Sequence, residues 1–128
     1  MRQGELAAGA KALLIRISPS SKSDPPKFVL CVMSAKEKLN NKTLKALLEA
    51  KNISFATPDE VWQVTKCVPG AVPPFGHLFG IKTYLDESLR SLERIEFNAG
   101  LRTRSVRMLE KDYEFVEEPV KCSFTSST

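Results

Sequence analysis

The chain has few of the residues that build disulfide scaffolds, metal centres and membrane spans. Its 128 residues include three cysteines and one histidine, with no CxxC pair. This scarcity argues against a disulfide framework or a zinc site and predicts a reducing compartment, with the cytoplasm as our default. No apolar run approaches the roughly 20 residues that a transmembrane helix needs. We therefore expect no metal, no cofactor and no contact with a membrane.

Common signatures of hydrolases and nucleotide-binding enzymes are also missing. The sequence contains no GxSxG, no Walker lysine motif and no GxGxxG, and its first ten residues lack the features of a secretory signal. Length and composition predict one globular domain. A net charge of +4, from 19 basic and 15 acidic residues, permits contact with a phosphate backbone but does not require it.

Strand and helix patterns intermix along the chain without strict βαβ alternation. A Thr-Pro-Asp-Glu sequence at residues 57–60 predicts a capped helix start. We expect an α/β fold, a single domain with a mixed sheet and packed helices, and a flexible tail over residues 118–128. Strands are predicted at 12–17, 28–33, 53–56, 80–85, 94–98 and 103–109, helices at 41–51, 58–66 and 110–117, and a turn or short helix at 86–89.

The segment CVPGAVPPFGH, residues 67–77, is the most unusual part of the sequence. It places three prolines and two glycines in eleven positions, which excludes a helix or a central strand. Gly70 and Pro74 form a GxxxP spacing, followed by Phe75 and Gly76. Amides of such a loop could face an anion, a carbonyl or a nucleotide. Spacing alone is equally compatible with a proline-rich connector.

Four further positions are candidates, each with a simpler alternative. Lys11 begins an apolar strand and could point into a cleft, although a solvated strand-end lysine is more common. The turn at residues 98–100 could bring backbone close to a ligand or could be only a turn. A single histidine such as His77 is more often structural or exposed than catalytic. Asp86 could orient a donor, but capping the following turn is the more common role.

Taken in order, six segments resemble the YbaK/prolyl-tRNA synthetase-associated editing domains, across roughly residues 8 to 113. The segments are GAKALLIR, FVLCVMSAKEKLNNKTLKALL, ISFATPDEV, PGAVPPFG, TYLDESL and FNAGLRTRSVRM. The resemblance implies a single α/β domain with a mixed, partly barrel-like sheet. It also implies an aminoacyl-tRNA deacylase that hydrolyses the ester of a mischarged tRNA, with tRNA(Pro) carrying a small non-cognate amino acid as the expected substrate.

The resemblance also implies roles for particular residues. Lys11, Gly70 and Pro74 match the family's functional lysine and GxxxP loop, and are the expected catalytic positions. An aminoacyl ester is already activated, so the site need only hold it, polarise its carbonyl and admit water. The expected substrate-binding positions are Ala71, Val72, Pro73, Phe75, Gly76, Asp86, Asn98, Ala99 and Gly100.

The expected partner is the aminoacylated 3′ end of tRNA, together with an aminoacyl-tRNA synthetase in cis or in trans. Two departures from the family pattern are visible. Only ten residues precede Lys11, which suggests a shortened or excised module, and no histidine follows the AG segment, which leaves the amino acid open. The alternative functions are an inactive tRNA- or protein-binding module of a synthetase assembly and an unrelated α/β binding domain.

The resemblance predicts that Lys11→Ala strongly lowers deacylation while the fold persists. The expected cause is the loss of a cation that stabilises developing charge or the terminal phosphate. Hydrolysis of mischarged tRNA by the folded variant, compared with wild type and with Lys11→Arg, measures the effect. Wild-type rates from folded Lys11→Ala would remove the lysine from the mechanism.

Overall fold

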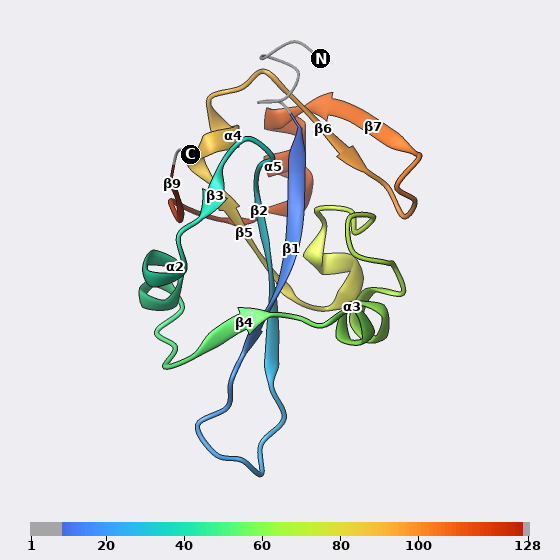
Figure 1. Ribbon diagram of the computed structural model, residues 1–128. Helices are drawn as coiled ribbons and strands as arrows, with labels where there is room; N and C mark the ends of the chain where they lie inside the picture. The colour runs from blue at the N-terminus through green and yellow to red at the C-terminus, as the bar shows by residue number, and fades with distance from the viewer. Residues whose placement is uncertain (1–8, 127–128) are drawn as a thin grey trace.

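The computed structural model describes residues 9–126 and contains one main sheet of five strands. The strands lie in the order β4-β1-β2-β5-β8, with β1 antiparallel to β2 and β4, and with the pairs β2–β5 and β5–β8 parallel (Figure 1). The predicted mixed sheet is therefore confirmed. Its strands are β1 (Ala10–Ile17), β2 (Lys27–Ser34), β4 (Ile53–Phe55), β5 (Lys82–Asp86) and β8 (Val120–Cys122).

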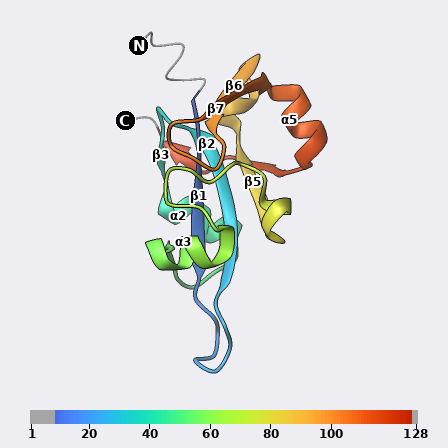
Figure 2. The same ribbon diagram turned by 90° about the vertical axis from the view of Figure 1, so that its right-hand side faces the viewer.

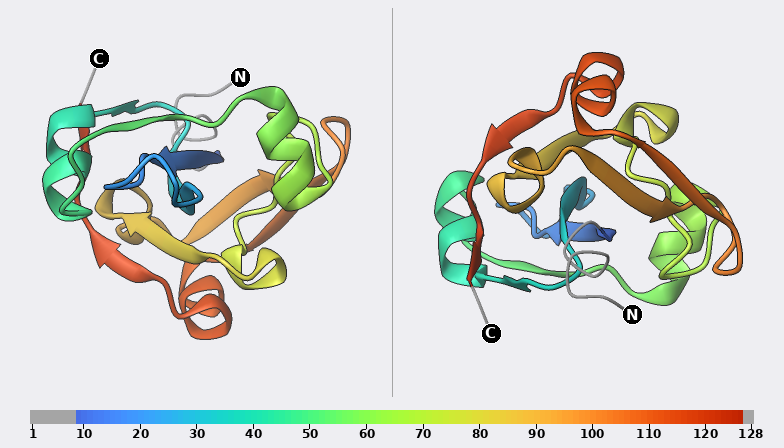
Figure 3. Two further views of the ribbon diagram at one scale, coloured as in Figure 1. Left: turned by 90° about the horizontal axis from the view of Figure 1, so that it is seen from below. Right: turned by 90° about the horizontal axis from the view of Figure 1, so that it is seen from above.

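Short elements surround the long β1–β2 pair, as the views along these strands show (Figure 3). Two small antiparallel sheets are formed by β3 (Lys38–Leu39) with β9 (Thr125–Ser126) and by β6 (Arg94–Asn98) with β7 (Ser105–Leu109). The helices are α2 (Asn41–Leu47), α3 (Pro58–Thr65), the 3-10 helix η1 (Gly76–Phe79), α4 (Glu87–Arg90) and α5 (Glu110–Glu117). Among the described residues, no helix has the length and apolar character needed to cross a membrane.

Alternation along β1 divides the core between two faces of the sheet. Leu14 belongs to a cluster that includes Val61 of α3, whereas Ile15 belongs to a cluster that includes Leu44 of α2 and Phe124. Successive side chains of a strand point to opposite faces, which explains why neighbours in β1 enter different clusters. Helices α2 and α3 accordingly lie on opposite sides of the β1–β2 pair (Figure 1).

Local capping signals in the sequence predict the helix starts well. The side chain of Thr57 accepts a hydrogen bond from the Glu60 amide at 3.1 Å, and the Glu60 carboxylate accepts one from the Thr57 amide at 2.9 Å. This capping box starts α3 with Pro58 in its first turn, as expected. Helix α2 is capped by Asn40 but ends earlier than predicted, because Glu49 takes a positive φ of 52° that breaks the helical path.

The expectation of a flexible tail is wrong for most of residues 118–126. This segment contains β8 and β9, and Phe124 between them is fully buried. Phe124 lies among polar residues in the sequence, so its anchoring role is not evident there. Burial of its ring offsets the conformational entropy that is lost when this short segment is ordered. Residues 127 and 128 lie outside the described residues.

Asp86 holds this segment in place from the end of β5. Its carboxylate accepts hydrogen bonds from the Phe124 amide at 2.7 Å, the Thr125 hydroxyl at 2.7 Å and the Ser88 amide at 2.9 Å. The Ser88 contact caps α4, so the capping role weighed from the sequence is confirmed. Asp86 is fully buried, and these contacts join β5, α4 and the last strand.

We expect Asp86→Asn to lower the free energy of unfolding by about 2–3 kcal/mol at neutral pH, because buried donors lose a charged acceptor. Burial alone would raise the pKa of Asp86, but hydrogen bonds from Ser88, Phe124 and Thr125 lower it below its ordinary value of 3.8. The stabilisation is therefore present above the unfolded-state pKa and is lost as the pH falls through the folded-state pKa.

Urea unfolding of wild type and Asp86→Asn between pH 7 and pH 3 measures this effect. The difference in stability should shrink as the solution becomes more acidic. Thr125→Val, which removes one of the three donors, serves as the control and should cost less than Asp86→Asn. A difference between Asp86→Asn and wild type that is independent of pH would contradict the proposed tether.

Candidate functional site

The proline-rich loop connects α3 to β5 and is anchored from the protein interior. Ala71 and Val72 are buried, and the Phe75 ring packs edge-on against Phe97 and Tyr113, with ring centroids 5.6 and 5.2 Å away. These contacts join the loop to β6 and to α5. The loop is therefore a shaped part of the core and has little freedom to move.

Hydrogen bonds tie the first half of the loop to the turn between β6 and β7. In Figure 1 this turn lies beside the loop. Three loop carbonyls accept from three residues of the turn: Pro69 O from Arg102 Nε at 2.9 Å, Gly70 O from Asn98 Nδ2 at 2.8 Å, and Ala71 O from the Gly100 amide at 2.8 Å. The two segments that the sequence nominated separately, 70–76 and 98–100, thus form one unit.

The second half of the loop is held by α5 and β5. The Tyr113 hydroxyl donates to Pro74 O at 2.5 Å, and the Gly76 amide donates to Thr83 Oγ1 at 2.8 Å. A Cβ on Gly76 would lie 2.4 Å from Thr83 Oγ1, so only glycine fits this approach. Burial, followed by the nearby carboxylates of Glu117 and Glu110, raises the pKa of Tyr113 and keeps the phenol protonated as a donor.

Three amides of the loop have no hydrogen-bond acceptor within residues 9–126, those of Val68, Gly70 and Val72. Prolines carry no amide hydrogen, and the amides of Ala71, Phe75 and Gly76 donate to Val68 O, Pro73 O and Thr83 Oγ1 respectively. Gly70 is exposed with a φ of +86°, whereas Val72, two residues further along, is buried. The loop therefore holds unpaired donors on a fixed backbone, and two of them, Gly70 and Val72, fall within the GxxxP spacing.

Lys11 does not join this arrangement. Its ammonium donates to Glu37 O at 2.8 Å, and Lys11 is paired across the sheet with Met33 of the second core cluster. The side chains of Val72 and Phe75 pack with the first cluster, on the other face. Burial lowers the pKa of Lys11, with the Glu37 carboxylate opposing the change. The amine would have to leave Glu37 O to reach the loop, so its catalytic role stays a prediction.

His77 lies immediately after the loop and has a buried partner. Its Nδ1 is 2.9 Å from Oε2 of Glu117, which also accepts a hydrogen bond from the Thr83 hydroxyl at 2.5 Å. The imidazole is 66% exposed, whereas the Glu117 side chain is 2% exposed. This contact joins the loop end to α5. In the part of the chain that is described, no group of three His, Cys, Asp or Glu is placed to hold a metal ion.

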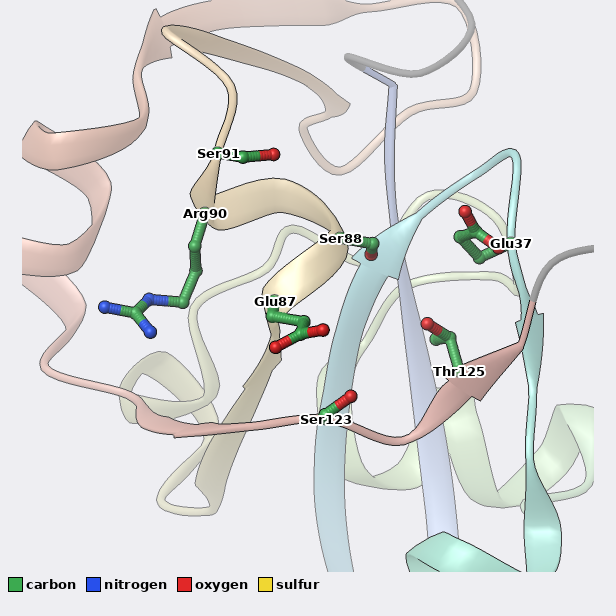
Figure 4. Close-up of a pocket in the computed structure, with 7 residues that line it drawn as sticks. All are labelled: Glu37, Glu87, Ser88, Arg90, Ser91, Ser123 and Thr125. Atoms are coloured by element: carbon green, nitrogen blue, oxygen red, sulfur yellow. The ribbon is translucent and has the colours of Figure 1, made fainter.

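The two described cavities lie elsewhere. One, of about 730 Å³, is lined by polar side chains that include Glu37, Ser88 and Thr125 (Figure 4). Another, of about 770 Å³, lies beside the connection between β1 and β2. Neither is lined by a residue of the predicted site, because the loop packs closely against its neighbours. The candidate site is thus a surface with open amides.

Two residues that hold the loop in place were missed by sequence reasoning. Arg102 was considered only as part of a segment without histidine, yet its Nε would lie 3.4 Å from a Cβ placed on Gly70. Tyr113 was assigned only to a short helix. A contact between residues about 30 to 40 positions apart has no local signature, so neither Arg102 nor Tyr113 could be paired with the loop from the sequence.

Helix α5 and the β6–β7 hairpin, which hold the loop, are seen from the side in Figure 2. Known structures have a similar overall fold. A candidate trans-editing enzyme for prolyl tRNA synthetase superposes with a TM-score of 0.81 at 23% identity, over 96% of this chain and 73% of its own. A hypothetical protein of solved structure gives a TM-score of 0.81 at 17% identity, over 94% and 76%. At these identities the likeness establishes the fold.

Sequence comparison establishes the family. The chain is 30% identical over 125 residues to the multifunctional Ser/Thr-tRNA deacylase ProXp-y of Escherichia coli K12, covering 97% of this chain and 73% of the relative. The corresponding protein of E. coli O157:H7 gives the same figures. The family model of the aminoacyl-tRNA editing domain matches residues 1–115. The chain belongs to the aminoacyl-tRNA editing domain family, whose members hydrolyse the ester bond of aminoacyl-tRNA.

Proposed function

We propose that this domain removes a small non-cognate amino acid from mischarged tRNA by binding the ester carbonyl at the amides of Gly70 and Val72. One observation carries the proposal. The carbonyls of Pro69, Gly70, Ala71 and Pro74 and the amides of Ala71, Phe75 and Gly76 are engaged in hydrogen bonds, so the backbone that carries the two donors is fixed in place before a substrate arrives. Donors that need no reorganisation are the most effective at stabilising developing charge.

Hydrolysis of the ester requires few further groups from the protein. Water attacks the ester carbonyl carbon, negative charge develops on the carbonyl oxygen, and the bond to the ribose oxygen then breaks. The ribose oxygen takes up a proton, leaving free amino acid and uncharged tRNA. Because the ester is already activated, orientation and stabilisation of the oxyanion account for the acceleration. A protein nucleophile is not needed in this scheme.

The name of the E. coli relative supports serine and threonine as the first amino acids to test on this chain. The solved candidate trans-editing enzyme supports tRNA(Pro) as the first tRNA and a synthetase as an associated partner, acting in cis or in trans. The E. coli relative acts on tRNA, which supports the cytoplasm as the location. An apolar pocket distinguishes a single methylene by only about 1–3 kcal/mol, so we propose a group of small amino acids as substrates.

Deacylation of a panel of mischarged tRNAs tests the proposal directly. The panel should contain tRNA(Pro) charged with alanine, cysteine, serine or threonine, and the cognate prolyl-tRNA as a control. We expect hydrolysis of at least one small non-cognate ester and little hydrolysis of the cognate one. Tight tRNA binding without hydrolysis of any ester would instead support the inactive binding module.

Gly70→Ala should lower the single-turnover deacylation rate of the folded protein about 100-fold. The new methyl would occupy the face where the ester approaches, 3.4 Å from Arg102 Nε. Gly80→Ala is a matched control, because Gly80 also has a positive φ, of 70°, and has open space around its Cβ position. Both variants should lose a similar 1–2 kcal/mol or so of stability from the left-handed backbone.

Rates are normalised to the folded fraction, measured from thermal unfolding. Only Gly70→Ala should lose turnover. Equal turnover of the two variants per folded molecule would show that the loop is a connector.

Tyr113→Phe tests whether the hydrogen bond to Pro74 O keeps the amides of Gly70 and Val72 in the orientation that binds the ester. The variant retains the ring packing against Phe75 but leaves a buried carbonyl without its partner, at a cost of about 1–3 kcal/mol. We expect deacylation to fall roughly tenfold per folded molecule, since a loosened loop needs reorganisation during the reaction. Pro74→Ala, which frees the backbone directly, should act in the same direction. Unchanged turnover in both variants would show that deacylation does not depend on the hydrogen bond that holds Pro74.

A further inference from the structure

The β6–β7 hairpin concentrates positive charge beside the candidate site. Residues 94–109 contain four arginines and one acidic residue, Glu96. The chain as a whole carries a net charge of only +4, so most of its excess positive charge is found in this hairpin. The hydrogen bonds from Asn98, Gly100 and Arg102 fix the hairpin turn to the loop. The charge is therefore held at a defined distance from the open amides.

Arg102 is the arginine nearest to Gly70. Its Nε donates to Pro69 O at 2.9 Å, and this bond holds the guanidinium in a fixed orientation. The two terminal nitrogens make no hydrogen bond or ion pair with any of residues 9–126, and the residue is exposed. A guanidinium that is anchored through Nε still presents a planar pair of donors, a geometry that suits two oxygens of a phosphate.

Arg104 and Arg107 extend the charge along the hairpin. Both are exposed, and the side chain of Arg104 has no partner in the described part of the chain. Its backbone is held by hydrogen bonds to Ala99 and Leu101, at 3.0 and 3.2 Å, which close the turn. Arg107 Nε lies 3.3 Å from Glu96 Oε1, but its side chain remains 69% exposed. Within the described residues, Arg104 thus carries an unpaired cation on the same turn as Arg102.

We propose that Arg102 and Arg104 form a binding site for the phosphates of the tRNA acceptor end. The inference rests on the proposed function, because that function puts the aminoacyl ester at Gly70 and Val72. The phosphate closest to such an ester belongs to the terminal nucleotide and would meet Arg102. The preceding phosphate would meet Arg104 further along the turn. Phosphate contacts of this kind position a nucleic acid without reading its sequence.

The test is binding of an uncharged acceptor-stem RNA hairpin ending in CCA, followed by fluorescence anisotropy over a series of salt concentrations. Each lost phosphate contact should reduce the slope of log K against log salt by about 0.7–0.9. We expect Arg102→Ala and Arg104→Ala each to show this reduction and to bind about tenfold more weakly at low salt. Arg102→Lys should keep the slope but lose affinity, because an ammonium lacks the anchored planar fork.

Lys22→Ala is the charge-matched control. Lys22 is exposed in the connection between β1 and β2. This connection lies at the bottom of Figure 1, at the opposite end of the β1–β2 pair from the β6–β7 hairpin. It should bind within twofold of wild type with an unchanged slope. Hairpin variants that behave like Lys22→Ala would overturn the inference, and so would wild-type binding without salt dependence. Because the RNA carries no ester, this failure is distinct from a failure of the proposed function, which appears as absent deacylation.

Arg102→Ala could also alter the loop through the lost bond to Pro69 O. Arg104→Ala avoids this problem, since the Arg104 side chain makes no hydrogen bond or ion pair within the described residues. An effect of Arg102→Ala alone, accompanied by a lower melting temperature, would assign Arg102 a structural role and overturn the two-arginine site. Effects of both variants at unchanged melting temperature would support it.

Discussion

The pairing of β1 with β2 is the constraint on which the other features depend. These two strands run through the centre of the domain, and their side chains pack alternately into two separate core clusters. One residue of β1 therefore faces α3 and the proline-rich loop, and the next faces α2 and the last strand. A shift of one residue in this register would exchange the two faces completely. Because of this alternation, Lys11 and the proline-rich loop lie on opposite faces of the sheet.

Local signals in the sequence predicted local structure. The capping box at Thr57 and Glu60, the strand patterns and the stiff loop correspond closely to what the structure contains. Order in the C-terminal segment was not predictable, because it depends on the burial of Phe124 and on a carboxylate 38 residues earlier in the chain. Hydrophobic periodicity describes which residues of one element share a face, and it does not say which distant donor satisfies a buried amide.

The same limit applies to the candidate site. Family resemblance selected the loop and the 98–100 turn, and the structure joins them through the backbone carbonyls of Gly70 and Ala71. A third carbonyl, that of Pro69, accepts from Arg102. The resemblance could not identify a role for Arg102, because the contact of this arginine with Pro69 is visible only once the turn is placed against the loop. Resemblance also grouped Asp86 with the substrate-binding positions, whereas its carboxylate is fully occupied by three internal donors. A shared motif thus includes residues that build the fold as well as residues that we propose to contact the substrate.

The hydrogen bonds that shape the loop have a consequence for the order in which the protein acquires activity during synthesis. Asn98, Arg102 and Tyr113 follow their loop partners by 28, 33 and 39 residues. A ribosome adds residues at about 5–20 per second, so the loop leaves the ribosome seconds before its supports exist. Until α5 emerges and docks, Gly70 and Val72 lie on a flexible segment of chain. The proposed site therefore forms late in synthesis, because the last third of the chain orders a loop in the middle third.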